Sequence, residues 1–242
     1  MKNTTLESVG IVFLHGAGLG AWIWEDVIKK ASYPCLAIDF PGRGKHSSIT
    51  TNNLTLNNYV ESVLADIDPF CHKKIIIVAH SISGVIGLEV SSKLKDRICG
   101  FIAISACIPS ANRSYISSMP LVMNLFLRLL FKFSGTRPPE TALRNALCND
   151  LEENQTLNVI KRFVPESTCL YTDRIHAQNV PENSIYVHLK KDKAFSESMQ
   201  KKMIANLHAK QVIDIESGHL PMLSKPDEIA NILNHFAAQV NN

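Results

Sequence analysis

The chain has 242 residues, of which 45% are hydrophobic and 19% charged, and this length suits one large hydrophobic core better than two. Its 25 basic and 22 acidic residues are spread along the sequence and give a formal net charge of +3, so the basic arm or stripe that nucleic-acid binding requires is missing. We therefore expect one globular domain, with room for an insertion, and the overall charge implies neither a nucleic acid nor an acidic surface as a partner.

Short apolar runs alternate with amphipathic segments along the chain. The runs are mostly β-branched and lack a two-residue alternation, as is typical of buried parallel strands. They cover residues 9–14, 35–38, 75–79, 98–104, 184–189 and 211–215. Helical patterns follow at 24–31, 55–70, 82–94, 196–207 and 226–240. The alternation predicts an α/β fold with a mostly parallel sheet of about six strands and helices on both faces.

One long interval breaks this alternation. From about Pro109 to Val180 the sequence offers helix-prone segments such as PLVMNLFLRLLFKF and PETALRNALCNDLEENQTLNVIKRF, but no good strand. An interval of roughly seventy residues between two strands of one sheet is too long for an ordinary connection. We predict a core made of residues 1–108 and 181–242, with residues 109–180 inserted after the fourth strand as a helical cap or lid.

The cysteines and the N-terminal sequence favour a reduced, cytoplasmic protein. The six cysteines show no CxxC pairing, and MKNTTLESVG lacks the apolar region of a secretory signal. We interpret each thiol as a small apolar side chain of the core. No apolar stretch reaches the roughly 18 residues needed to span a bilayer. The histidines share no metal-like spacing, so no metal site is expected.

Ser81 lies at an abrupt corner in the stretch IIIVAHSISG, residues 75–84, where a buried strand gives way at once to a helix. A nucleophilic serine on such a turn needs small residues two positions before and after it, because backbone passes close on both sides. Ala79 and Ser83 fill these positions, and Gly84 follows. The motif departs from G-x-S-x-G, so by itself it leaves an ordinary strand-to-helix turn open.

Two later segments supply a base and an acid. A serine nucleophile needs a base to accept its proton and a carboxylate to orient that base. His219 follows the strand QVIDI, and Asp192 follows the strand SIYVHL, so both emerge at the edge of the sheet where Ser81 lies. Asp214 is the rival acid, but it falls within a predicted strand. We therefore predict Ser81, Asp192 and His219 as the catalytic residues.

The loop FLHGAGLGAWIW after the first strand is the candidate oxyanion hole. Its glycines allow a close backbone approach, and we expect the amides of Ala17 and Ile82 to bind the oxyanion. We interpret His80 as a packing or substrate-facing residue. Together with Gly16 and Leu220 it is a candidate for the wall of the substrate pocket.

The motifs HGAGLGAWIW, AIDFPGRG, VAHSISG, KKDKAF and SGHLPMLSKP occur in this order over nearly the whole chain. The sequence in this respect resembles the α/β-hydrolase superfamily, and more narrowly the branch of plant-type methyl esterases, hydroxynitrile lyases and related bacterial esterases. The resemblance implies an α/β-hydrolase fold, a triad of Ser81, Asp192 and His219, a short lid, and neither cofactor nor metal.

Two positions distinguish the lyases from the esterases of that branch. The lyases carry a threonine after the first-loop histidine and a lysine after the catalytic histidine, whereas this chain has Gly16 and Leu220. The resemblance therefore implies an esterase that cleaves a small or medium carboxylic ester through an acyl-enzyme. A non-hydrolytic lyase, a thioesterase or lactonase, and a binding protein that keeps the fold without turnover stay open. The sequence leaves the oligomeric state undetermined.

Overall fold

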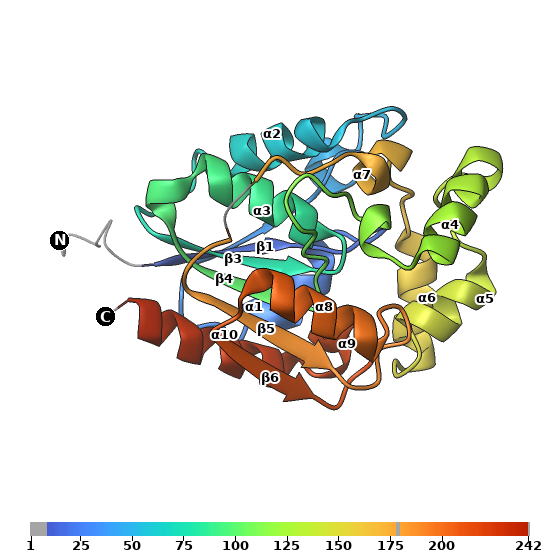
Figure 1. Cartoon of the computed structure of the whole chain (residues 1–242). Helices are drawn as coiled ribbons and strands as arrows, with labels where there is room; N and C mark the ends of the chain where they lie inside the picture. Colours follow the sequence, from blue (N-terminus) through green and yellow to red (C-terminus); the bar gives the residue numbers. More distant parts are fainter. Residues whose placement is uncertain (1–8, 178–179, 242) are drawn as a thin grey trace.

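The computed structural model describes residues 9–177 and 180–241. Within them, six parallel strands form one sheet in the order β2-β1-β3-β4-β5-β6 (Figure 1). The strands are β1 (Gly10–Leu14), β2 (Cys35–Ile38), β3 (Ile75–His80), β4 (Ile98–Ile104), β5 (Ser184–Leu189) and β6 (Gln211–Ile215). The predicted parallel α/β sheet is confirmed, and β3 continues one residue beyond its predicted end, to His80.

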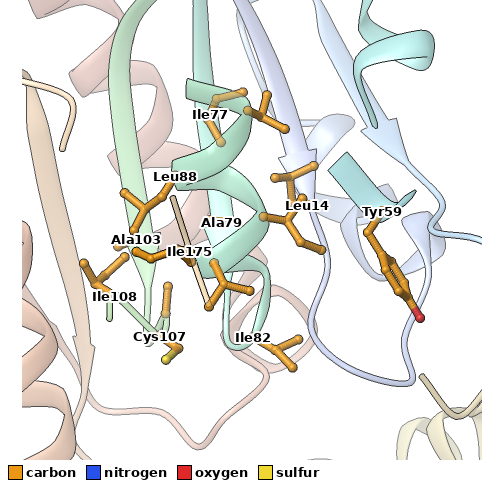
Figure 2. Packing of buried hydrophobic residues seen from close by; sticks show 14 of the residues in the cluster. Leu14, Tyr59, Ile77, Ala79, Ile82, Leu88, Ala103, Cys107, Ile108 and Ile175 are labelled. Carbon is orange, nitrogen blue, oxygen red and sulfur yellow. The ribbon is translucent and has the colours of Figure 1, made fainter. Parts of the chain in front are cut away.

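The sheet is covered on both faces, which explains why its strands read as uninterrupted apolar runs. Along β1, Val12 and Leu14 pack in a cluster on one face, while Ile11 and Phe13 pack in a second cluster on the other. Figure 2 shows the first cluster, in which residues of β1, β3 and β4 pack against Leu88 of the helix that follows β3. Every side chain of the central strand β3 is buried.

Helices lie on the two faces of the sheet as predicted. One face is covered by α2 (Leu56–Ile67), α3 (Ser83–Lys93) and α8 (Glu197–Leu207). The other is covered by η1 (Ala21–Trp24), α1 (Glu25–Ile28), α9 (Pro221–Ser224) and α10 (Pro226–Val240). Single turns occur at η2 (Gly44–His46) and η3 (Lys95–Arg97). The helix predicted at 24–31 forms only as the single α-helical turn α1, which the 3-10 turn η1 precedes.

The interval between β4 and β5 is helical, and it contains no strand among its described residues. It holds η4 (Ile116–Ser118), α4 (Leu121–Ser134), α5 (Glu140–Ala142), the π-helical turn η5 (Leu143–Leu147), α6 (Glu153–Arg162) and α7 (Thr168–Thr172). Its last part returns to the core, where Leu170 and Ile175 pack in the first cluster. The domain boundaries stay a prediction, and Gln178 and Asn179 lie outside the described residues.

The order of the strands places the chemistry-bearing loops at one end of the molecule. From β1 the chain moves to β2 on one side and then to β3 on the other. Because all strands are parallel, the loops after β1, β3, β5 and β6 lie at the carboxyl end of the sheet. Open α/β sheets bind ligands at this end, beside the point where the strand order reverses direction. The helices α4 to α6 lie beyond that end (Figure 1).

The cysteines follow the sequence interpretation in part. All six are free. Cys107 and Cys148 are buried, but Cys71 is exposed, so the prediction of a core position is wrong for Cys71. In the described part of the chain, no helix is both long and apolar enough to cross a membrane. Of the ten N-terminal residues used to judge a secretory signal, residues 1–8 lie outside the described residues.

Candidate active site

Ser81 occupies a strained backbone turn between β3 and α3. Its φ angle is 57°, in the left-handed region that a residue with a side chain rarely adopts. The end of β4 holds this turn on both sides, since the amide of Ser81 donates to the Ile104 carbonyl (3.2 Å) and the amide of Cys107 donates to the Ser81 carbonyl (2.8 Å). A Cβ at Gly84 would lie 2.2 Å from the Cys107 carbonyl oxygen, so the next turn of the helix requires glycine.

The serine that replaces glycine two residues after Ser81 has a structural use. The hydroxyl of Ser83 accepts a hydrogen bond from the amide of His80 at 2.8 Å. It lies 3.0 Å from the carbonyl of Leu14, to which it donates. Ser83 therefore joins the end of β1 to the corner that carries Ser81. This bond explains why the turn tolerates the departure from G-x-S-x-G.

The structure brings the three predicted catalytic side chains into one hydrogen-bonded chain. Ser81 Oγ lies 3.0 Å from His219 Nε2, and His219 Nδ1 lies 2.7 Å from Asp192 Oδ2. The carboxylate accepts a hydrogen bond from the N–H at Nδ1, which leaves Nε2 free to accept the hydroxyl proton of Ser81. This is the geometry that a serine nucleophile and its base require.

Four donors hold the carboxylate of Asp192. Besides His219, the hydroxyl of Ser105 donates to Oδ2 at 2.7 Å, and the amides of Ala194 and Phe195 donate to Oδ1 at 2.7 and 2.8 Å. Burial alone would raise the pKa of Asp192, but the charge of His219 and these hydrogen bonds outweigh it and lower that pKa below its usual value. Asp192 therefore stays ionised beside the imidazole.

The rival acid, Asp214, lies away from this chain of hydrogen bonds. It is in β6, its side chain is 57% exposed, and its carboxylate pairs with Nδ1 of His188 at 2.9 Å. The structure thus places Asp214 in a surface hydrogen bond with His188 and Asp192 beside His219.

The loop after β1 lies directly against Ser81. A Cβ at Gly16 would come within 3.1 Å of the Cβ of Ser81. Among the described residues, neither the amide of Ala17 nor that of Ile82 donates to another protein group. An amide without a protein acceptor beside a nucleophile is available to a developing oxyanion.

His15 fixes the start of this loop. Its Nε2 accepts from the amide of Phe40 at 3.2 Å, so its Nδ1 carries the proton and donates to the Gly16 carbonyl at 2.8 Å. Burial, and then the positive charge of Arg43, lower the pKa of His15 well below its usual value. The neutral ring thereby orients the peptide that precedes Ala17.

The sequence pattern of a known family covers most of the chain. The Alpha/beta hydrolase family matches residues 11–232, which include all three residues of the hydrogen-bonded chain. This protein belongs to that family.

Its relatives in the family include esterases. Methylesterase 10 of Arabidopsis thaliana is 24% identical over 260 residues, which cover 95% of this chain and 92% of that protein. Polyneuridine aldehyde esterase of Rauvolfia serpentina is 24% identical over 248 residues, covering 92% and 93%. An extracellular α/β-hydrolase from a Paenibacillus species has the same fold, with a TM-score of 0.83 and 20% identity over 93% of this chain and 97% of that one.

Two residues predicted to line a substrate pocket occupy packing positions in this hydrolase. His80 is fully buried, and its Nε2 donates to the His219 carbonyl at 2.8 Å. Burial, and then the charge of His219, lower the pKa of His80 to about 3, so its ring is neutral. Leu220 is fully buried in the second core cluster. Of the three predicted wall residues, Gly16 is the one that lies against Ser81.

Three polar residues that support the catalytic loops were not found from the sequence. Ser105 donates to Asp192 at 2.7 Å. Asp150, between η5 and α6, accepts from the amide of Gly218 at 2.6 Å, next to His219. Glu166, after α6, accepts from the amide of Gly18 at 3.0 Å. Ser105 directly follows β4, at the same end of the sheet as Ser81, and this position was a signal in the sequence. Nothing in the sequence links the two carboxylates to these loops.

Glu166 is the centre of a buried polar network. Arg43 donates to Oε1 from Nη1 at 2.5 Å and to Oε2 from Nη2 at 2.9 Å. The hydroxyl of Tyr59 donates to Oε2 at 3.0 Å. Because Gly18 donates to the same carboxylate, the network holds the far side of the loop that carries Ala17.

Within the described residues, no cluster of His, Cys, Asp and Glu could hold a metal ion.

Proposed function

We propose that this protein is a serine esterase that hydrolyses small or medium carboxylic esters through an acyl-enzyme. The observation that carries the proposal is the hydrogen-bonded chain from Ser81 through His219 to Asp192 at a strained corner of the sheet. The methylesterases and esterases among the relatives support a methyl or other small alkyl ester as the substrate.

We assign a residue to each step of the reaction. Ser81 attacks the acyl carbonyl while His219 Nε2 accepts the hydroxyl proton, and the amides of Ala17 and Ile82 stabilise the oxyanion. His219 then protonates the departing alcohol, and a water molecule repeats the sequence on the acyl-enzyme. Asp192 holds the imidazole in the required tautomer throughout.

The residues next to the nucleophile favour ester hydrolysis over cyanohydrin cleavage. Cyanide leaves as an anion, and an apolar pocket stabilises an anion poorly unless a cation or hydroxyl donor is present. Gly16 contributes no side-chain donor beside Ser81, and Leu220 contributes no charge beside His219. The two positions suit an oxyanion held by backbone amides.

The test is a panel of p-nitrophenyl esters of increasing chain length, run together with methyl esters, on the wild type and on Ser81→Ala. We expect Ser81→Ala to keep its fold and to lose turnover and labelling by a fluorophosphonate probe. Ser110→Ala is the matched control, because Ser110 is exposed and far along the chain from the corner. A folded Ser81→Ala protein with turnover within about tenfold of the wild type would contradict the proposal.

A further inference from the structure

The cap helix α4 exposes an unusual amount of apolar surface. Seven of the ten exposed large hydrophobic side chains among the described residues lie on this one helix, and none of its residues is buried. They are Leu121, Val122, Met123, Leu125, Phe126, Leu129 and Phe133, between 47% and 81% exposed. The largest apolar patch on a typical monomer covers roughly 300–600 Å² and is often functional. Figure 1 shows α4 at the outer edge of the cap.

The helix packs on the protein by one face only, and its other face is equally apolar. Leu127 and Phe131 lie against the first core cluster, and the ring of Phe131 is 4.8 Å from that of Tyr171. Val122, Leu129 and Phe133 project on the opposite side, where an ordinary surface helix carries polar residues. Packing against residues 9–177 and 180–241 therefore does not explain the outer apolar face.

The charges beside this face are positive. Arg128 and Lys132 are the ionisable residues of α4, and both are exposed. The sequence contains no acidic residue between Asp96 and Glu140. An apolar helix face bordered by cations is the pattern of helices that lie in the interface of an anionic membrane.

We propose that α4 is a docking helix for an anionic lipid surface. The side chains of Leu125, Leu129 and Phe133 enter the acyl region, while Arg128 and Lys132 contact the phosphate groups of the lipids. Such a helix lies along the surface and does not span the membrane.

A second copy of the chain fits the same face less well. A symmetric contact between two α4 helices places the same patch of both copies together. It would bring Arg128 and Lys132 of one copy near those of the other, and α4 carries no carboxylate to neutralise them. An anionic lipid surface neutralises both cations, so the charges favour lipid.

A row of aromatic rings connects the inner face of α4 to the candidate active site. Successive ring centroids are 4.8 Å apart from Phe131 to Tyr171, 5.4 Å from Tyr171 to Tyr115, 6.0 Å from Tyr115 to Phe195 and 5.7 Å from Phe195 to His219. These rings form a continuous packed row between the helix and the imidazole.

The catalytic side chains are covered in this arrangement. Ser81 is 7% exposed and His219 is 1% exposed. We expect docking that draws α4 toward the lipid to separate Phe131 from Tyr171 and so uncover the row of rings that ends at His219. The docking helix therefore points to esters that partition into lipid as the substrate class. This assignment of substrate rests on the proposed esterase function, whereas docking itself does not.

The docking test measures binding in the Ser81→Ala protein, so that turnover plays no part. The probes are vesicles of phosphatidylcholine alone and of phosphatidylcholine mixed with phosphatidylglycerol, at low and high salt, followed by flotation. We expect binding to the anionic vesicles that weakens in high salt. Leu129→Gln with Phe133→Gln should reduce it at least about tenfold, and Arg128→Gln with Lys132→Gln by a similar factor. Leu157→Gln is the matched control, an exposed leucine on α6.

Three results would overturn the docking proposal. They are the absence of binding to anionic vesicles at low salt, binding that the α4 substitutions leave unchanged, and an α4-dependent dimer in sedimentation velocity without lipid. The wild type then tests the substrate class, with a medium-chain ester that partitions into anionic vesicles and a short ester in solution. If the double variant Leu129→Gln with Phe133→Gln loses hydrolysis of the ester in vesicles but keeps hydrolysis of the short ester, the assignment of the substrate class is supported. Vesicle binding without hydrolysis of any ester would contradict the esterase function and leave docking standing.

Discussion

The substitution Glu166→Gln tests whether the network between the cap and the loop after β1 stabilises the fold. The side chain of Glu166 is 0% exposed and that of Arg43 is 6% exposed, so both charges of this ion pair are out of water. Glutamine keeps one oxygen that can accept from the amide of Gly18. Its NH₂ group replaces the oxygen that accepts from Arg43 Nη2 and the Tyr59 hydroxyl.

The expected cost follows from the charge that remains. Removing one partner of a buried ion pair typically costs about 3–5 kcal/mol, because the other charge is left buried without compensation. For a chain of this size each kcal/mol lowers the Tm by roughly 2–4 °C, so Glu166→Gln should lower it by about 6–20 °C. The loop that carries Ala17 should loosen as well, and ester hydrolysis should fall with it.

The assay is urea unfolding and calorimetry of Glu166→Gln beside a matched surface variant. Glu216→Gln breaks the exposed pair with Lys190, whose side chains are 59% and 46% exposed, and it should cost no more than about 1 kcal/mol. The double variant Arg43→Met with Glu166→Leu should regain much of the loss, because no unpaired charge remains. If Glu166→Gln unfolds within about 1 kcal/mol of the wild type, the reasoning on this network is wrong.

Three further predictions concern the candidate active site. Asp192→Asn should lower ester turnover by about 10⁴-fold and Asp214→Asn should leave it near the wild type; the reverse order would make Asp214 the acid. Burial, and then the charge of His219, lower the pKa of His80 to about 3, whereas an unfolded histidine has a pKa of roughly 6.5. Between these pH values the folded state binds fewer protons than the unfolded state. The free energy of unfolding should therefore fall as the pH drops through this range. His80→Gln should flatten that fall in urea titrations at several pH values, and an unchanged slope would contradict the assignment. A Cβ at Gly16 would lie 2.8 Å from His80 Nδ1, so the larger side chain of Gly16→Thr should displace its neighbours. We expect this variant to hydrolyse p-nitrophenyl acetate at least about tenfold more slowly than the wild type and to release no cyanide from mandelonitrile. Full esterase activity would refute the contact.

The strands were predictable because burial on both faces leaves a mark in the sequence. Residues 98–104 and 184–189 are strands with the bounds that their apolar runs predicted. The helix predicted at 24–31 ends early for a local reason that periodicity does not show. The amides of Lys30 and Ala31 donate to the carbonyls three residues before them, at 3.1 and 3.2 Å, which tightens the chain into a turn.

The three residues that meet at the catalytic edge were predictable from topology. Ser81, Asp192 and His219 each follow a strand, and parallel strands deliver such residues to one edge. Glu166 and Asp150 were not predictable, because their partners lie 148 and 68 residues away along the chain. A carboxylate that accepts a distant backbone amide looks, in the sequence, the same as one that faces water.

These two carboxylates hydrogen-bond one part of the cap, which does not include α4, to the loops of Ala17 and His219. Glu166 holds the amide of Gly18 and Asp150 holds the amide of Gly218, so the part of the cap around α6 is bonded to both catalytic loops. Helix α4 touches the core through apolar contacts such as Phe131, and its Asn124 side chain bonds within the cap, to the Ile116 carbonyl at 2.7 Å. Apolar contacts can be exchanged for lipid at little cost, whereas the buried hydrogen bond of Glu166 and the partly buried one of Asp150 cannot. On the docking proposal, α4 can therefore move while these hydrogen bonds keep the loop after β1 and the loop of His219 in place.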